Sequence, residues 1–363
     1  MKQPWKENWN ESRERFSSWW KHDALLLGSW GTGMPRSAGP RCTVSLPPEP
    51  ATHRGRMTDP VYVARRVRSE MAAKAWPGDL LPVAWPDIGT VCTAPMLGSG
   101  IEYGPNNVWY TARSDASEPD SWPELALAPG HPEVSCLESL VRESVRVADW
   151  DYFVGMPAVI PNLDVLAELR GAGELLMDFY DRPEWIIAKL LEIDEAWKTI
   201  FDRLYDIVKF PDGSMCFGYF MLWGMGKTGL LQCDVAANFS PDMFEEYAIP
   251  RLEAECAFLD NSMYHVDGHQ CLGDVDAVLG LKDLDAVEWT PDPQVPNGGD
   301  PEWFPMYRKV IEAGKSLWVA NLRPAQIAPL LDAIGTKGVY LTVDVPSEEA
   351  YAESWAVVER YRK

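Results

Sequence analysis

Hydrophobic positions in the second half of the chain fall into two alternating patterns, short continuous apolar runs and longer stretches with helical spacing. The runs predict buried strands at 215–223, 262–266, 286–289, 316–320 and 339–343. The helical spacing predicts helices at 134–149, 183–209, 240–258, 274–280, 301–313 and 324–334, with a last helix opened by Ser347-Glu348-Glu349. Strands that alternate with helices of this length are typical of parallel βαβ units.

The first third of the chain is less regular. Residues 1–23 predict a polar helical extension with aromatic anchors, and 24–30 a buried strand followed by a Gly/Pro-rich loop. Residues 88–132 are rich in Gly, Pro and aromatic residues and are interpreted as an insertion that contains a hairpin. With about eight strand candidates and no dinucleotide fingerprint, we expect an α/β fold of the (β/α)8 TIM-barrel type, as one domain over 1–363.

Composition narrows the partners and the compartment. The chain has 33 Lys+Arg against 54 Asp+Glu, a net charge of −21, which repels phosphate backbones and anionic membranes, so neither partner is expected. Seven Cys without C-x-x-C predict neither a disulfide framework nor a zinc ribbon. Without a secretion-type N-terminus or an apolar run of about 18 residues, we expect a cytoplasmic protein. The 17 Trp indicate either packing or an aromatic pocket.

The polar residues that end the predicted strands are the candidates for chemistry, because barrel enzymes build their sites at the carboxyl ends of strands. Residues distant in sequence would converge there. The set comprises Trp30, Asp87, Asn162 or Asp164, Trp223, Asp234, His265 with Asp267, Glu288, Asn321 and Asp344.

His265 and Asp267 form the sharpest local pattern. Residues two apart in a strand face the same side, where an imidazole and a carboxylate can bind a divalent metal or share a proton. We expect catalytic roles for His265, Asp267, Glu288 and Asp234. A metal, with zinc the first choice, would be held by His265, Asp267, Glu288 and Asp344; the alternative is a hydrogen-bonded histidine without metal. Expected substrate-binding residues are Trp30, Trp223, Tyr264, His269 and Asn321.

Several motifs, in order and spacing, resemble the uroporphyrinogen decarboxylase superfamily over most of the chain. They are Leu169-Arg170-Gly171, Asp181-Arg182-Pro183-Glu184, Leu231-Gln232-Cys233-Asp234, Ser240-Pro241-Asp242-Met243-Phe244, Tyr264-His265-Val266-Asp267-Gly268, Asp285-Ala286-Val287-Glu288-Trp289 and Lys337-Gly338-Val339-Tyr340. The resemblance implies a single (β/α)8 barrel with its site at the strand carboxyl ends.

Two departures from the superfamily patterns bear on function. The decarboxylases carry Met-Arg-Gln-Ala-Gly-Arg after the first strand, whereas this chain has Gly31-Thr32-Gly33-Met34-Pro35-Arg36. The corrinoid-dependent methyltransferases bind zinc through His-x-Cys and a later Cys. Here His265 matches the histidine, Asp267 stands in the first Cys position and Asp344 near the second. Oxygen ligands instead of thiolates argue against thiol methylation and leave open the demethylation of an O- or N-methyl substrate.

The leading hypothesis is therefore a methyltransferase-type enzyme for a small methylated substrate. The resemblance implies cobalamin on a separate corrinoid protein, since nothing in this chain resembles a cobalamin-binding domain. The second hypothesis is a lyase or hydrolase for a small carboxylate or sugar-like substrate. The third is a non-catalytic binding barrel. A homodimer is left open.

Overall fold

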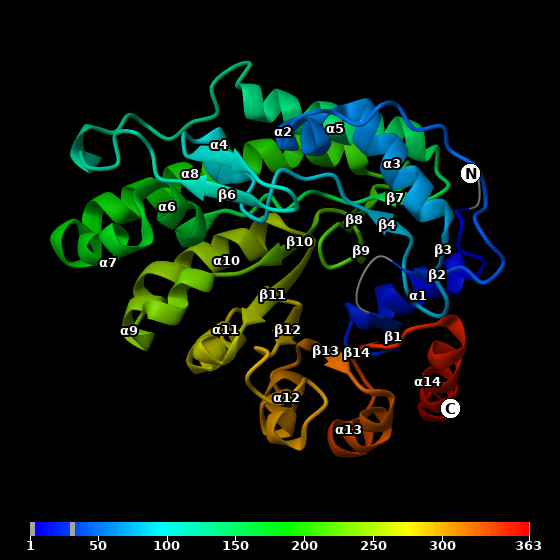
Figure 1. The fold of residues 1–363 in the computed structure, drawn as a ribbon. Coiled ribbons are helices and arrows are strands. Elements are labelled where there is room, and N and C mark those ends of the chain that lie inside the picture. Colours follow the sequence, from blue (N-terminus) through cyan, green and yellow to red (C-terminus); the bar gives the residue numbers. More distant parts are fainter. Residues whose placement is uncertain (1–3, 30–32, 363) are drawn as a thin grey trace.

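The core of the fold is a six-stranded parallel sheet. The computed structural model describes residues 4–29 and 33–362. In the sheet, the strand nearest the N-terminus lies beside the strand nearest the C-terminus (Figure 1). The order is β1 (Leu25–Ser29), β14 (Val339–Val343), β13 (Ser316–Leu322), β12 (Ala286–Thr290), β11 (Asn261–Asp267) and β10 (Thr228–Leu231).

The strands are continuous apolar runs because most of their residues are buried on both faces. Helices follow the strands along the chain and flank the sheet in Figure 1. They are α10 (Ile249–Phe258), α11 (Val275–Leu279), α12 (Phe304–Glu312), α13 (Ile327–Ile334) and α14 (Glu348–Tyr361). The strand–helix alternation predicted from the sequence is confirmed in this half.

Besides the six-stranded sheet, the structure contains shorter two-stranded pairs. β4 (Val83–Ala84) pairs in parallel with β7 (Phe153–Val154), and β8 (Ser214–Phe217) pairs antiparallel with β9 (Leu222–Met225). A single parallel bridge joins Met156 to Phe217. Within the described residues these pairs stay separate from the six-stranded sheet, so the structure shows a mixed α/β fold with a central parallel sheet.

Of the remaining helices, α5 packs against both α3 and α8. These helices are α2 (His53–Thr58), α3 (Pro60–Ala72), α4 (Thr93–Met96), α5 (Pro132–Ala148), α6 (Asn162–Arg170), α7 (Ala172–Asp181), α8 (Pro183–Val208) and α9 (Pro241–Met243). The region 88–132 holds the expected hairpin, β5 (Gly100–Tyr103) with β6 (Val108–Thr111), and β2 (Met34–Pro35) pairs with β3 (Lys74–Ala75). None of the helices in these ranges has the length and hydropathy of a membrane span.

The prediction of one strand over 215–223 is wrong. The chain reverses between β8 and β9, where Met221 has a φ of 52°, and the strand that enters the parallel sheet is β10. Both arms of the hairpin are mostly buried, so the apolar run continues through the reversal. Periodicity alone cannot distinguish this arrangement from a single buried strand.

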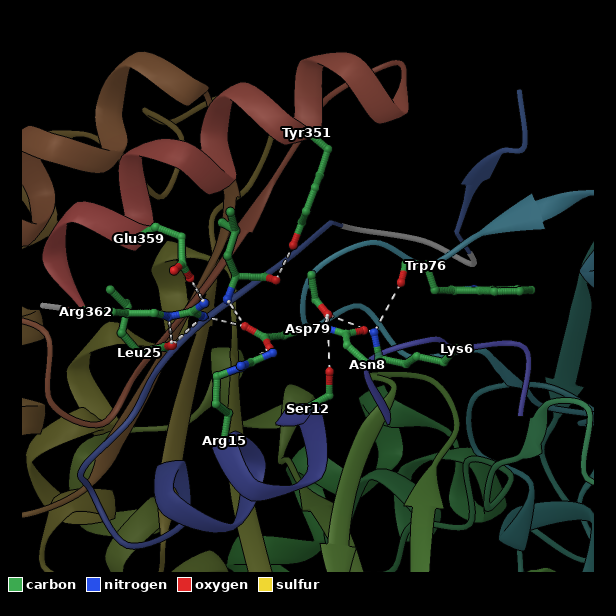
Figure 2. Close-up of polar contacts among 12 residues, drawn as sticks. Lys6, Asn8, Ser12, Arg15, Leu25, Trp76, Asp79, Tyr351, Glu359 and Arg362 are labelled. Carbon is green, nitrogen blue, oxygen red and sulfur yellow. Dashed lines mark hydrogen bonds and ion pairs between the residues drawn. The ribbon is translucent and has the colours of Figure 1, made fainter. Parts of the chain in front are cut away.

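A buried carboxylate, Asp79, ties both ends of the chain to β1 (Figure 2). Its side chain accepts hydrogen bonds from the Leu27 backbone N–H (3.0 Å) and from Arg362 Nη2 (2.6 Å), and it also pairs with Arg15. Tyr351 on α14 donates its hydroxyl to the Leu27 carbonyl (2.5 Å). The first helix, the last helix and the first strand are thereby joined at the amino end of the sheet.

The carbonyl of Gly78, next to Asp79, gathers the N-terminal segment at the same place. It accepts hydrogen bonds from Lys6 Nζ (2.8 Å), Asn8 Nδ2 (2.9 Å) and Ser12 Oγ (3.2 Å), as Figure 2 shows. Ser12 belongs to α1 (Trp9–Trp19), which contacts β1 and β9. The amino end of the sheet is therefore covered by α1.

We predict that Asp79→Asn lowers the free energy of unfolding by about 3–5 kcal/mol, because two guanidinium groups lose a buried partner. Urea unfolding measures the change. Arg66→Met is the matched control: it breaks an exposed pair with Glu70 and should cost less than about 1 kcal/mol. Equal losses of unfolding free energy in the two variants would contradict the conclusion that Asp79 joins both ends of the chain to β1.

Candidate functional site

Four register partners on neighbouring strands form a row across one face of the sheet. His265 on β11 pairs with Glu288 on β12, Glu288 with Trp318 on β13, and Trp318 with Tyr340 on β14. Partners in register point to the same face. The rings of Trp318 and Tyr340 lie 4.8 Å apart and nearly parallel. The β13–β14 end of the row is therefore a packed aromatic surface.

His265 and Glu288 make a buried imidazole–carboxylate pair. His265 Nδ1 donates to Glu288 Oε2 at 2.5 Å, and Thr290 Oγ1 donates to the other carboxylate oxygen at 2.7 Å. The ring of Phe220 lies 4.9 Å from the imidazole. Asp267 Oδ1 stands 3.9 Å from Nε2. Because Nδ1 is engaged by Glu288, Nε2 is the ring nitrogen that can act on a substrate.

The surroundings of His265 favour its charged form. Burial by itself lowers the pKa of the imidazole, but the charge and hydrogen bond of Glu288 and the charges of Asp234 and Asp267 outweigh it, so the pKa of His265 is raised. An imidazolium held in this way can donate a proton from Nε2.

Asp234 is held at the end of β10 by a second carboxylate. Asp164 accepts the backbone N–H of Asp234 (3.1 Å) and that of the next residue (3.0 Å). Gln232 Nε2 donates to both carboxylates, at 3.1 Å to Asp164 and 2.8 Å to Asp234. Burial and then the charge of Asp164 raise the pKa of Asp234 to about 7, against the opposing effect of His265. Asp234 can therefore carry a proton near neutral pH.

Tyr219, which follows β8, faces carboxylates from several strand ends. Its side chain is 40% exposed, and its ring lies 6.4 Å from that of Trp85. Burial and then the charges of Asp267, Asp87 and Asp234 raise its pKa. Burial also raises the pKa of Asp87 to about 6. Carboxylates that follow strands far apart in the sequence therefore lie close enough to act on the same tyrosine.

The charge of the space around His265, Asp234 and Tyr219 is predominantly negative. In the described residues, the principal charges that shift the pKa of His265, Asp234 and Tyr219 belong to carboxylates and to His265 itself, and none to Lys or Arg. The space therefore favours a cationic guest over an anionic one.

Other predicted residues lie apart from this group. Tyr264 is buried on the opposite face of β11 from His265. Trp223 packs edge-on against Trp9 of α1 (5.8 Å), with Arg13 over its ring. These contacts place Trp223 at α1, which covers the amino end of the sheet.

Within the described residues, no hydrogen bond or ion pair joins His265 to the predicted residues His269 after β11, Asn321 in β13 or Asp344 after β14. His269 binds Asp292 through Nδ1 at 2.6 Å. Asn321 has a φ of 58° at an irregularity in the β13–β14 pairing. Asp344 is exposed after β14. Trp30 lies outside the described residues.

The sequence reasoning missed the supporting residues of the site. Gln232, Tyr219 and Phe220 were not among the candidates. Gln232 stands two positions before Asp234, so strand alternation could have placed it on the same side. No local pattern indicates that Phe220 covers His265, because that contact joins segments far apart in the chain.

The described side chains do not fit the predicted zinc site. Within residues 4–29 and 33–362, no group of three or more His, Cys, Asp or Glu is arranged to hold a metal ion. Glu288 engages Nδ1 of His265, and in the described part of the chain no hydrogen bond or ion pair joins the Asp344 side chain to this pair. Burial, with the charge of Asp234, raises the pKa of the nearby Cys271 thiol to about 12, so a thiolate is not favoured. The metal remains a prediction.

A separate cavity of about 360 Å³ lies at the amino end of the strands. Its lining includes Trp9, Arg13, Trp150, Phe153 and Phe210. It is distinct from the His265 space and belongs to the end of the sheet that barrel enzymes use for stability rather than chemistry.

Comparison with known proteins gives a likeness of fold. A methyltransferase from Methanosarcina mazei is 13% identical, with 97% of this chain and 99% of that chain covered and a TM-score of 0.58. An HpcH/HpaI aldolase from Desulfitobacterium hafniense DCB-2 is 16% identical over 61% of this chain and 78% of that chain, with a TM-score of 0.24, which is too low to carry an argument. No protein family and no curated protein matches the chain.

We predict that Glu288→Gln lowers the pKa of His265, because the nearest negative charge is removed while burial remains. In the wild type, the stabilisation from the charged pair is complete below the unfolded pKa of about 6.5 and is lost as the pH rises through the raised folded value. In the variant this loss moves to lower pH.

NMR titration of the imidazole signals measures the shift, and His265→Gln assigns the resonance. Asp292→Asn is the control, since it removes the carboxylate that pairs with His269 and should leave the titration of His265 unaltered. An unchanged His265 midpoint in Glu288→Gln would contradict the pairing.

Proposed function

We propose that the chain is a methyltransferase-type enzyme with a single (β/α)8-barrel domain, transferring a methyl group from a small methylated donor to a corrinoid on a separate protein. The observation that carries the proposal is the buried His265–Glu288 pair, which faces Asp234 and Asp267 at the carboxyl end of the sheet. The fold likeness to a methyltransferase over nearly the whole of both chains supports it. The cytoplasmic location and the homodimer remain predictions.

The charge of the site selects an N-methyl donor in its cationic form. The charges of Asp267, Asp87 and Asp234 act on Tyr219, and among the described residues no Lys or Arg is one of the principal charges there. The faces of Tyr219 and Trp85 can add cation–π attraction to a methylated ammonium group. A carboxylate or phosphate donor would instead be repelled.

The chain's own residues account for proton handling. His265 Nε2 and the Asp234 carboxyl group keep the donor nitrogen protonated, and Glu288 stabilises the imidazolium through Nδ1. When the methyl–nitrogen bond breaks, its electron pair stays on nitrogen, which leaves as a neutral amine. The corrinoid on the partner protein would supply the acceptor for the methyl group.

The test is incubation with a Co(I) corrinoid protein and a panel of methylated donors. N-methyl amines should give methyl-cobalt absorbance, and methylated carboxylates should not. His265→Gln should slow the reaction about 100-fold or more, the usual scale of acid–base catalysis. His269→Gln, an exposed histidine four residues away, should change it little.

Absence of methyl-cobalt across the panel would refute methyl transfer. Turnover of a small carboxylate or sugar-like substrate without a corrinoid, abolished in His265→Gln, would instead support the lyase or hydrolase hypothesis, since the His265–Glu288 pair can serve acid–base chemistry alone.

A further inference from the structure

Asn162, the first residue of α6, is a buried asparagine in an unfavourable backbone conformation. Its φ is 66°, a region that glycine adopts without strain, and its exposed fraction is 2%. The side chain uses its hydrogen-bonding capacity in both directions. Nδ2 donates to the Gln232 carbonyl (2.8 Å) and to Glu255 Oε1 (3.1 Å), and Oδ1 accepts the Asp164 N–H (3.2 Å). A side chain kept at the cost of strain indicates a specific task.

Glu255 on α10 stands behind Asn162 and is 1% exposed. Burial, and then the charge of Asp194, raise its pKa well above the usual range, which favours the uncharged form of Glu255. Its Oε2 has no hydrogen-bond partner in the described residues. Asp194 is itself paired with Arg251 at 3.0 Å. A buried acid with one oxygen unpaired is costly, and an apolar side chain of similar size would avoid this cost.

Hydrogen bonds connect Asn162 and Glu255 to Asp234 through two intermediate residues. Asn162 holds the main chain of Gln232, which follows β10, and of Asp164 in the first turn of α6. Asp164 in turn accepts the Asp234 N–H, and the Gln232 side chain donates to Asp234. A continuous series of hydrogen bonds thus runs from Glu255 through Asn162 to the carboxylate that acts on His265.

We propose that Asn162 and Glu255 are positioning residues that hold Asp234 at its working place beside His265. The proposal rests on the proposed function of the His265 site for its catalytic consequence, but the positioning is measurable without substrate. Neither residue touches the reacting atoms. Both act through Gln232 and Asp164.

The decisive variant is Asn162→Gly, which keeps the backbone conformation without strain and removes all three side-chain hydrogen bonds. The fold should survive. Hydrogen exchange of the Asp234 and Val235 amides should rise at least about tenfold, because the Asp164 carboxylate that they bind is no longer fixed. The pKa of Asp234, followed by carboxyl ¹³C shifts, should fall below about 7 as Asp234 separates from Asp164.

Steady-state kinetics distinguish a positioning role of Asn162 from a role in substrate binding. Asn162→Gly should lower kcat by about 100-fold, the scale of a misplaced catalytic group, with KM little changed. Its pH–rate limb should move with the Asp234 pKa.

Glu255→Gln and Glu255→Leu form a matched pair. Gln keeps an uncharged acceptor for Asn162 Nδ2 and should behave like the wild type. Leu removes the acceptor and should show the same direction of change as Asn162→Gly in exchange and in Asp234 titration.

Wild-type exchange and titration in Asn162→Gly, or identical behaviour of the two Glu255 variants, would overturn the proposal. Failure of the proposed function gives a different result. In that case the wild type transfers no methyl group, while amide exchange and the Asp234 titration still respond to Asn162→Gly.

Discussion

The hydrogen bond between His265 and Glu288 is the constraint on which the site depends. Glu288 is fully buried in a parallel sheet, a position that a carboxylate can occupy only with partners. The β11–β12 register supplies His265 as one partner, and Thr290 supplies the other. Because this bond fixes Nδ1, it directs Nε2 toward Asp267 and the open end of the strands. The charges of Asp234 and Asp267 then act on an imidazole whose Nε2 has a defined position.

The two ends of the sheet are built for different purposes. At the amino end, Asp79 and the Gly78 carbonyl join α1, α14 and β1 in a buried network with several cationic partners. At the carboxyl end, carboxylates gather around His265, and no Lys or Arg of residues 4–29 and 33–362 is among the principal charges there. The first arrangement stabilises the fold. In the second, burial and then the charge of Asp164 raise the pKa of Asp234, and a bound cation would offset both effects.

The sequence predicted the features that depend on local pattern. Buried strands, helix caps and the polar residues that end strands follow from alternation and spacing, so His265 and Glu288 were found together with their sheet. It failed where the answer depends on contacts between distant segments. The reversal at Met221 is hidden in an apolar run, and Trp223 is drawn to α1 by packing. The role of Asn162 follows from its partners on β10 and α10, which no local pattern reveals.

The central claim is that a cationic methylated group binds beside His265, and NMR titration with trimethylammonium tests it most directly. The account predicts saturable shifts of the His265 ring signals, which disappear in the Asp234→Asn/Asp267→Asn double variant. The cavity at the amino end, lined by Trp9 and Trp150, provides the internal comparison. Shifts confined to those residues, or no saturable change at His265, would contradict the account.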